Sequence, residues 1–182
     1  MKVKLLFISL LFCLFNNNLS QIIVNNNNPF NNAISLVDSI LLGGGVVSSN
    51  HTFQGDAIQV GYFNAVNTNL NMDSGIVMST GDINSLDPNF NGVINLPVNN
   101  VSDPDLLTVA NSVPGLIGQT FSVSGIFDAA LLEFDFIPNS DSLVFNYIFG
   151  SNEYLTWVNS EYNDVFGFFI SGPGISGPYS SP

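Results

Sequence analysis

Hydrophobic and polar residues alternate in several short segments, a pattern typical of half-buried β-strands. In the clearest case, Leu132, Phe134 and Phe136 share one strand face, whereas Glu133 and Asp135 share the other. Turn-forming Asn, Asp, Gly and Pro residues separate such segments from one another. The pattern predicts strands at 46–47, 58–63, 75–79, 131–137, 143–149 and 164–171.

Two of the expected strands are apolar on both faces, at residues 143–149 and 165–170. A strand that buries both faces lies in the middle of packed sheets and not at an edge. We therefore expect a mostly β fold, an antiparallel and jelly-roll-like β-sandwich with one or two short helices.

Two segments predict those short helices. Residues 33–42 carry apolar side chains at helical spacing, follow asparagines that can cap a helix and precede a run of three glycines. Residues 104–110 begin with Pro104 in the first helical position, and either Ser102 or Asp103 can cap them.

The N-terminus has the composition of a signal peptide. Lys2 and Lys4 precede the apolar run 5–15, which is too short to span a bilayer, and a polar stretch then ends at Ser20. We expect cleavage after residue 20 and therefore an exported mature chain.

The remaining residues divide into two parts. Residues 21–32 form an Asn-rich leading segment without apolar periodicity, expected as a loop, and residues 33–182 form one β domain. The apolar strand near the C-terminus is followed only by a Gly/Ser/Pro turn run. We expect further strands, and an anchor or sorting signal, beyond Pro182.

Charge and cysteine content exclude several classes of protein. Removing residues 1–20 leaves fourteen acidic residues, no Lys, no Arg and no Cys, a net charge of −14 with His51 neutral. Such a chain has no cations with which to bind nucleic acid, anionic lipid or phosphate. We expect no nucleic-acid partner, no membrane insertion of the mature domain and no disulfide scaffold.

Catalytic chemistry has little support in the sequence. The mature chain has one histidine, His51, and no Gly-x-Ser-x-Gly elbow, so a hydrolytic triad is not expected. A glycosidase needs only two carboxylates, and Glu133 and Asp135 lie about 7 Å apart on one strand face. We expect no catalytic residues, and keep a glycan-degrading enzyme as the alternative, in which Glu133→Gln abolishes turnover.

Calcium suits the chain better, because calcium takes only oxygen ligands. The acidic chain has many carboxylates and amides but no EF-hand loop. Asp103 is equally explained as a helix cap, and the Asn163–Asp164 pair as a turn. The expected calcium ligands are Asp103, Asp105, Glu153, Asn163 and Asp164.

Aromatic residues gather beside amide and acidic residues in the C-terminal third, a composition that suits sugar binding. The expected ligand-binding residues are Tyr154, Trp157 and Tyr162, with Tyr147 nearby. The same rings could instead close the core of the sandwich. Full burial of Trp157 and Tyr162 would exclude the sugar-binding hypothesis.

Several blocks of the sequence, spread over roughly residues 33–175, resemble the bacterial choice-of-anchor L family. One departure is Asn152 in the segment 150–154, where the family more often has Glu; if that residue is a ligand, the site is weakened. The matching blocks are Leu42–Val46, Gly61–Phe63, Gly75–Gly81, Leu132–Phe136, Phe145–Tyr154 and Tyr162–Gly174.

The resemblance implies an exported domain joined to variable C-terminal anchors, and it implies no reaction. We therefore expect a secreted module, extracellular or at the bacterial cell surface, used for adhesion or for binding a glycan or surface protein. We expect calcium to stabilise it and no catalysis. The alternatives are the glycan-degrading enzyme and a structural spacer, in which exposed aromatics are scattered.

Overall fold

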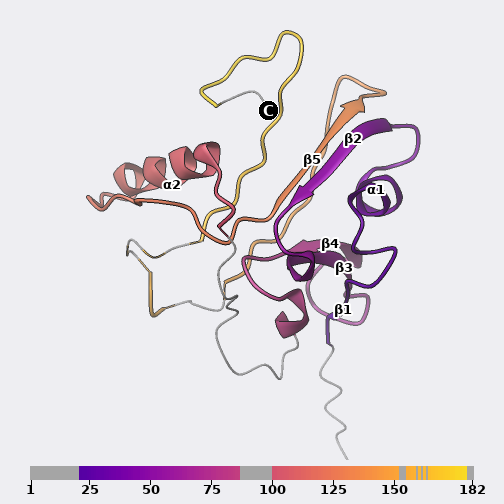
Figure 1. Cartoon of the computed structure of the whole chain (residues 1–182), viewed down its shortest axis with the longest axis horizontal. Helices are drawn as coiled ribbons and strands as arrows, with labels where there is room; N and C mark the ends of the chain where they lie inside the picture. Colours follow the sequence, from indigo (N-terminus) through magenta and orange to yellow (C-terminus); the bar gives the residue numbers. More distant parts are fainter. Residues whose placement is uncertain are drawn as a thin grey trace, which may run out of the picture.

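The computed structural model describes residues 21–86, 100–151, 155–158, 160, 162 and 164–179 of the chain. Within them the fold is mixed and β-leaning, with two small antiparallel sheets (Figure 1). Two short α-helices, α1 (Ala33–Leu36) and α2 (Pro104–Leu116), accompany the sheets.

The first sheet has the order β1-β3-β4, with β1 at Ile23–Asn25, β3 at Val60–Asn64 and β4 at Ser74–Met78. The central strand β3 contributes Val60 and Phe63 to the core. β1 lies in the segment that we expected to be a loop, so that expectation is wrong. Three residues are too few to show a period, and β1 becomes a strand by pairing with β3.

The second sheet pairs β2 (Val47–Gln54) with β5 (Leu131–Ile137) in antiparallel register. β5 has the bounds predicted from its alternating pattern. A bulge between Ser49 and Thr52 leaves Asn50 with a positive φ of 53° and shifts the pairing.

The helix predicted at residues 33–42 is confirmed. The Asn32 side chain accepts a hydrogen bond from the Ile34 backbone N–H at 2.9 Å and so caps α1. The helix continues as a wider π-type turn, η1 (Val37–Leu41). Leu36 and Val37 are fully buried and join this element to the core.

The second helix is also confirmed and is longer than predicted. Asp103 accepts from the Leu106 N–H at 2.7 Å, Pro104 occupies the first turn, and α2 runs on to Leu116. The Asn111 side chain pairs with both the N–H and the C=O of Val123, at 2.8 and 3.0 Å. These two bonds hold the returning chain against the helix, which local propensity could not predict.

A buried glutamine joins the short 3-10 turn η2 (Ala57–Gln59) to a distant loop. Gln59 is fully buried. Its Oε1 accepts from the Asp56 N–H at 2.6 Å, and its Nε2 donates to the Asp128 C=O at 2.8 Å. This side chain therefore stabilises a contact across 69 residues of sequence.

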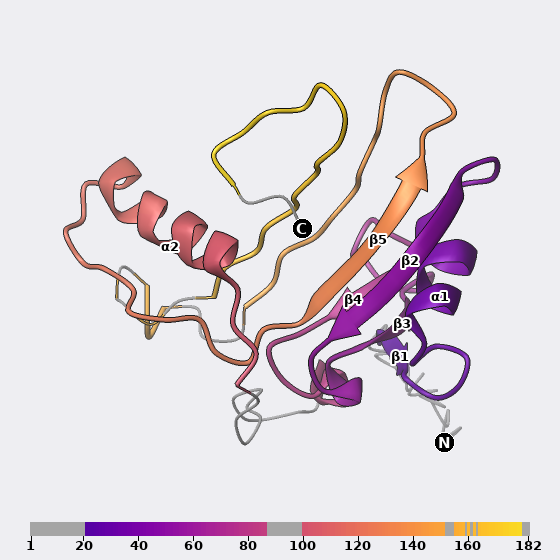
Figure 2. The ribbon, with the colours of Figure 1, turned by 45° about the horizontal axis from the view of Figure 1, so that its top comes forward.

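The segments expected as central strands of a sandwich are not buried. Figure 2 shows the chain turning after β5 and running back beside that strand. Residues 143–149 and 164–170 are extended but form no strand ladder, and Val144 is 82% exposed. No closed sandwich forms within the described residues, because no further layer covers these segments. Nor is any helix among those residues long and apolar enough to cross a bilayer.

Candidate ligand-binding surface

Four aromatic side chains, hereafter the aromatic ladder, join the two extended segments. Phe145 lies against Phe168 with ring centroids 4.3 Å apart, and Tyr147 lies against Phe166 at 5.3 Å. Two residues forward along the chain, from Phe145 to Tyr147, the contacted ring lies two residues back, at Phe166 instead of Phe168. This is the register of antiparallel neighbours, so ring contacts align the segments.

The opposite side of segment 164–170 rests on α2. A Cβ atom added at Gly167 would lie 3.0 Å from Leu106 Cδ2 and 2.6 Å from the Phe169 ring. Glycine therefore permits the close approach of segment and helix. The Phe169 ring also packs edge-on against Tyr179, with centroids 5.0 Å apart. The two ladder rings of this segment, Phe166 and Phe168, therefore lie on the face that points away from α2.

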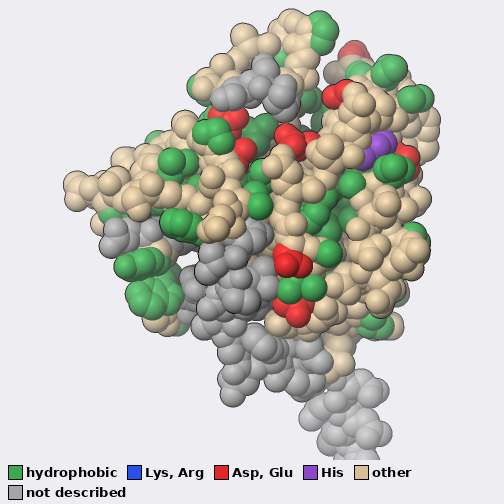
Figure 3. Space-filling view, in the orientation of Figure 1, with side chains coloured by type: hydrophobic (Ala, Val, Ile, Leu, Met, Phe, Trp, Pro, Cys, Tyr) green, Lys and Arg blue, Asp and Glu red, His purple; other side chains and the backbone are tan. Residues whose placement is uncertain are grey.

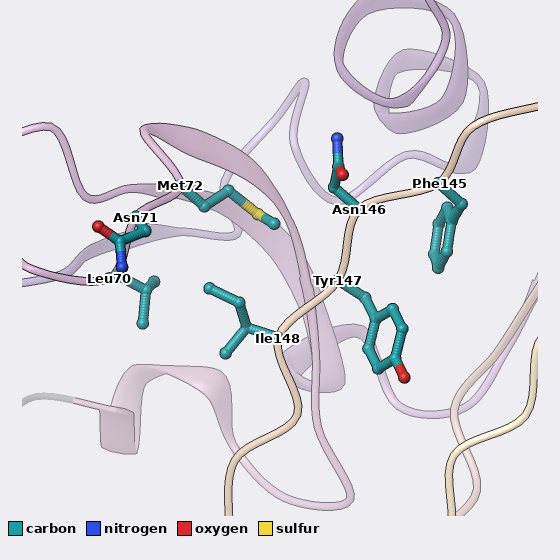
Figure 4. Close-up of a pocket in the computed structure, with 7 residues that line it drawn as sticks. All are labelled: Leu70, Asn71, Met72, Phe145, Asn146, Tyr147 and Ile148. Carbon is teal, nitrogen blue, oxygen red and sulfur yellow. The ribbon is translucent and has the colours of Figure 1, made fainter.

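An open groove of about 750 Å³ lies between the turn before β4 and segment 145–148. Figure 4 shows Ile148 on the side of Leu70 and Met72, whereas Tyr147 points to the other side of the chain. The groove is lined by Leu70, Asn71, Met72, Phe145, Asn146, Tyr147 and Ile148.

The aromatic pair expected to bind ligand is exposed. Trp157 and Tyr162 keep 45% and 62% of their surface exposed, and their rings meet at 69° with centroids 5.4 Å apart. The Ser160 hydroxyl lies 2.7 Å from the Trp157 carbonyl and accepts from the Tyr162 N–H at 3.2 Å. Sequence reasoning missed Ser160, although its position between the two aromatics is a turn signal. Tyr154 lies outside the described residues.

The expected calcium ligands do not converge within the described part of the chain. Asp103 caps α2 and Asp105 lies in the first turn of that helix. No three His, Cys, Asp or Glu side chains of the described residues form a group that could hold a metal ion. Glu153 and Asn163 lie outside those residues.

Asp164, the remaining expected ligand, has an unusual environment. Burial raises the pKa of its carboxyl, and a hydrogen bond with the Thr80 side chain partly opposes that shift. Because the folded state binds the Asp164 proton more tightly than the unfolded state does, this proton stabilises the fold. The stabilisation is fully present below the ordinary carboxyl pKa and is lost as the pH rises through the raised pKa. Above the raised pKa, the ionised Asp164 carboxylate therefore contributes less to the stability of the folded state than the protonated form does.

The acidic pair on β5 projects from one face, as the alternation predicted. Glu133 accepts hydrogen bonds from Gln54 at 3.2 Å and from Thr52 at 3.4 Å. Asp135 accepts from Asn50 at 2.5 Å. Each carboxylate is thus bound by neutral side chains of β2. The pair adds polar cross-strand contacts to the β2–β5 sheet.

His51 lies between η1 and the second sheet, with its side chain 8% exposed. Its ring stacks on Phe134, with centroids 6.3 Å apart. One nitrogen, Nε2, lies 3.2 Å from Asp38 Oδ1 and 3.0 Å from Ser48 Oγ. A hydrolytic triad uses both ring nitrogens, one toward the nucleophile and one toward the acid. This cluster therefore has the geometry of a structural contact between η1 and β2.

Fold and surface together define a small β-leaning module with a supported, exposed aromatic surface. The Choice-of-anchor L domain model matches residues 23–180, so the chain belongs to this family. The family implies a module of a cell-surface anchored protein. The comparison with curated proteins and the comparison with solved structures each gave no match.

Proposed function

We propose that this chain is a secreted, non-catalytic module that binds an extracellular ligand at the Trp157–Tyr162 pair, with a glycan as the ligand class. The observation that carries the proposal is the exposure of both rings. In a structural spacer we expect exposed aromatics to be scattered, whereas these two rings contact each other with centroids 5.4 Å apart.

The geometry of the pair supports a glycan. The two rings meet edge to face, so ring faces stay free for a flat apolar partner. A sugar ring offers such a face together with hydroxyl groups. The Tyr162 side chain adds a hydroxyl that can donate or accept a hydrogen bond, and the Ser160 hydroxyl, 3.0 Å from the Tyr162 carbonyl, is a second polar group of this turn.

We expect soluble polysaccharide fragments to change the fluorescence of Trp157, which is the single tryptophan of the chain. A panel of β-glucan, mannan and chitin oligosaccharides is titrated against residues 21–182. The Tyr162→Ala variant should weaken binding by about tenfold or more, because central aromatic contacts dominate binding sites. Trp157→Ala, followed by calorimetry, should abolish binding.

The matched control for this titration is Phe127→Ala, which removes an equally exposed aromatic side chain, 67% exposed, from another loop. It should leave the affinity unchanged. An unchanged affinity in Tyr162→Ala would place the ligand elsewhere. No response to any member of the panel would favour the spacer function.

We also propose that calcium stabilises the folded chain through Asp164. The support is the desolvated carboxylate at that position and a mature chain without Lys or Arg to neutralise it. Glu153 and Asn163 are the neighbouring oxygen ligands that the sequence offers.

A thermal melt tests the calcium proposal. A site with a Kd of about 10 μM in about 1 mM calcium should add about 2.7 kcal/mol to the free energy of unfolding, and a chelator should remove this gain. In Asp164→Asn the calcium response should disappear, while stability in chelator stays equal or rises because a desolvated charge is removed. Asp141→Asn, an exposed acidic position, is the control. A calcium response that survives Asp164→Asn would contradict the proposal.

A further inference from the structure

The backbones of the two extended segments are unpaired in the part of the chain that the structure describes. Within the described residues, no backbone N–H or C=O of 143–150 or 164–170 has a hydrogen-bond partner. Paired strands would satisfy about half of these groups with each neighbour. On its outer side each segment therefore offers a row of strand-forming groups, as an uncovered sheet edge does.

These rows are already in register. The Phe145–Phe168 and Tyr147–Phe166 contacts hold the segments side by side at antiparallel positions. Contact with α2 through Gly167 and Leu106 fixes one segment from behind. The two segments are thus already aligned before a partner binds, so less conformational entropy is lost when a sheet forms.

We propose that the aromatic ladder and its two segments are a docking site for an extended β-strand of another protein. The strand would pair with free backbone groups along the outer edge of one segment and place its alternate apolar side chains beside the ladder rings. This is the mode of recognition in which main-chain hydrogen bonds give affinity and side chains give specificity. It is separate from the glycan site proposed at Trp157 and Tyr162.

Charge defines the chemistry of this strand. Asp141 precedes one segment and Asp164 begins the other, so acidic groups flank an uncharged ladder when no calcium is bound. Figure 3 shows acidic side chains beside exposed hydrophobic ones on the described surface. The partner strand therefore carries Lys or Arg beside its apolar residues. A second copy of the chain is disfavoured, because fourteen acidic residues on each copy would repel one another.

Ring geometry separates this site from a sugar platform. Phe145 and Phe168 are stacked with an angle of 18° between their planes, and Tyr147 and Phe166 with 22°. The rings of each pair cover one face of each other. Less flat ring surface is then left for a sugar, whereas the side chains of a strand can pack against ring edges.

The test uses residues 21–182 and a labelled nine-residue peptide of alternating Val and Thr with Lys at both ends. Fluorescence anisotropy should show saturable binding that weakens as ionic strength rises from about 0.05 M to about 0.5 M. Hydrogen exchange should slow at 143–149 and 164–170 when peptide is bound. Phe145→Ala should weaken binding by about tenfold, whereas Leu116→Ala, on an 83% exposed position of α2, should not.

Two altered peptides and one property of the free chain can overturn the proposal. A peptide with Pro at the central position cannot pair as a strand, so equal binding would contradict strand addition. A peptide with Glu at both ends should not bind, and equal binding would contradict the charge argument. Self-association that protects the same amides without peptide would show that a second copy is the occupant. Absence of binding or protection with the Lys peptide would also overturn the proposal.

Discussion

Replacing Gln59 with leucine is expected to lower the free energy of unfolding by about 3 kcal/mol, because two part-buried backbone groups lose their hydrogen bonds to this fully buried side chain. The Asp56 N–H donates to Gln59 Oε1 at 2.6 Å, and the Asp128 C=O accepts from Nε2 at 2.8 Å. Leucine has a similar volume but can make neither bond. Urea unfolding followed by far-UV circular dichroism measures the change.

Gln54→Leu is the matched control for Gln59→Leu. It makes the same replacement at an exposed position whose amide donates to Glu133 at 3.2 Å. Exposed groups exchange one partner for water, so we expect a change within about 0.5 kcal/mol. Equal losses in the two variants would mean that the buried bonds of Gln59 add nothing to stability.

Gly61→Ala should cost about 2–3 kcal/mol, because the centre of the first sheet has no room for a methyl group. A Cβ atom there would lie 2.6 Å from Ile83 Cδ1 and 2.7 Å from the backbone oxygen of Asn25. The Ile83 side chain could shift, but the Asn25 oxygen belongs to β1, which pairs with β3. We therefore expect β1 to separate from the sheet, with faster hydrogen exchange at residues 23–25.

Two further variants separate the sources of this cost. Gly43→Ala adds a methyl group where no atom lies within 4 Å and should change stability by less than about 0.5 kcal/mol. In an Ile83→Val background, which lacks Cδ1, Gly61→Ala should cost less than in the parent chain. An unaltered free energy of unfolding in Gly61→Ala alone would show that the sheet can accommodate the methyl group.

Much of the local structure could be predicted from the sequence. The asparagines before residue 33 and Asp103 before Pro104 mark the starts of both helices, since caps are set by neighbouring residues. Strict alternation gave the bounds of β5. In contrast, β1 was missed because a strand of three residues depends on its partner, and the end of α2 because Asn111 binds a distant backbone.

The candidate site was predicted only in part. Trp157 and Tyr162 were identified from composition, and both are exposed. Asp103 was weighed as a metal ligand or a cap, and the structure places its carboxylate on the Leu106 N–H. The aromatic ladder could not be predicted, because Phe145 and Phe168 meet only through the register of two separate segments.

By itself, the sequence determined the secondary-structure tendency, the acidic charge, the family and the presence of many aromatic side chains. Those properties depend on residues within a few positions of each other or on totals over the chain. Only the tertiary structure decided which rings meet, which face of 143–149 stays open and that Gln59 joins two loops. Such contacts join residues far apart in sequence, and their geometry depends on the packing of every intervening element.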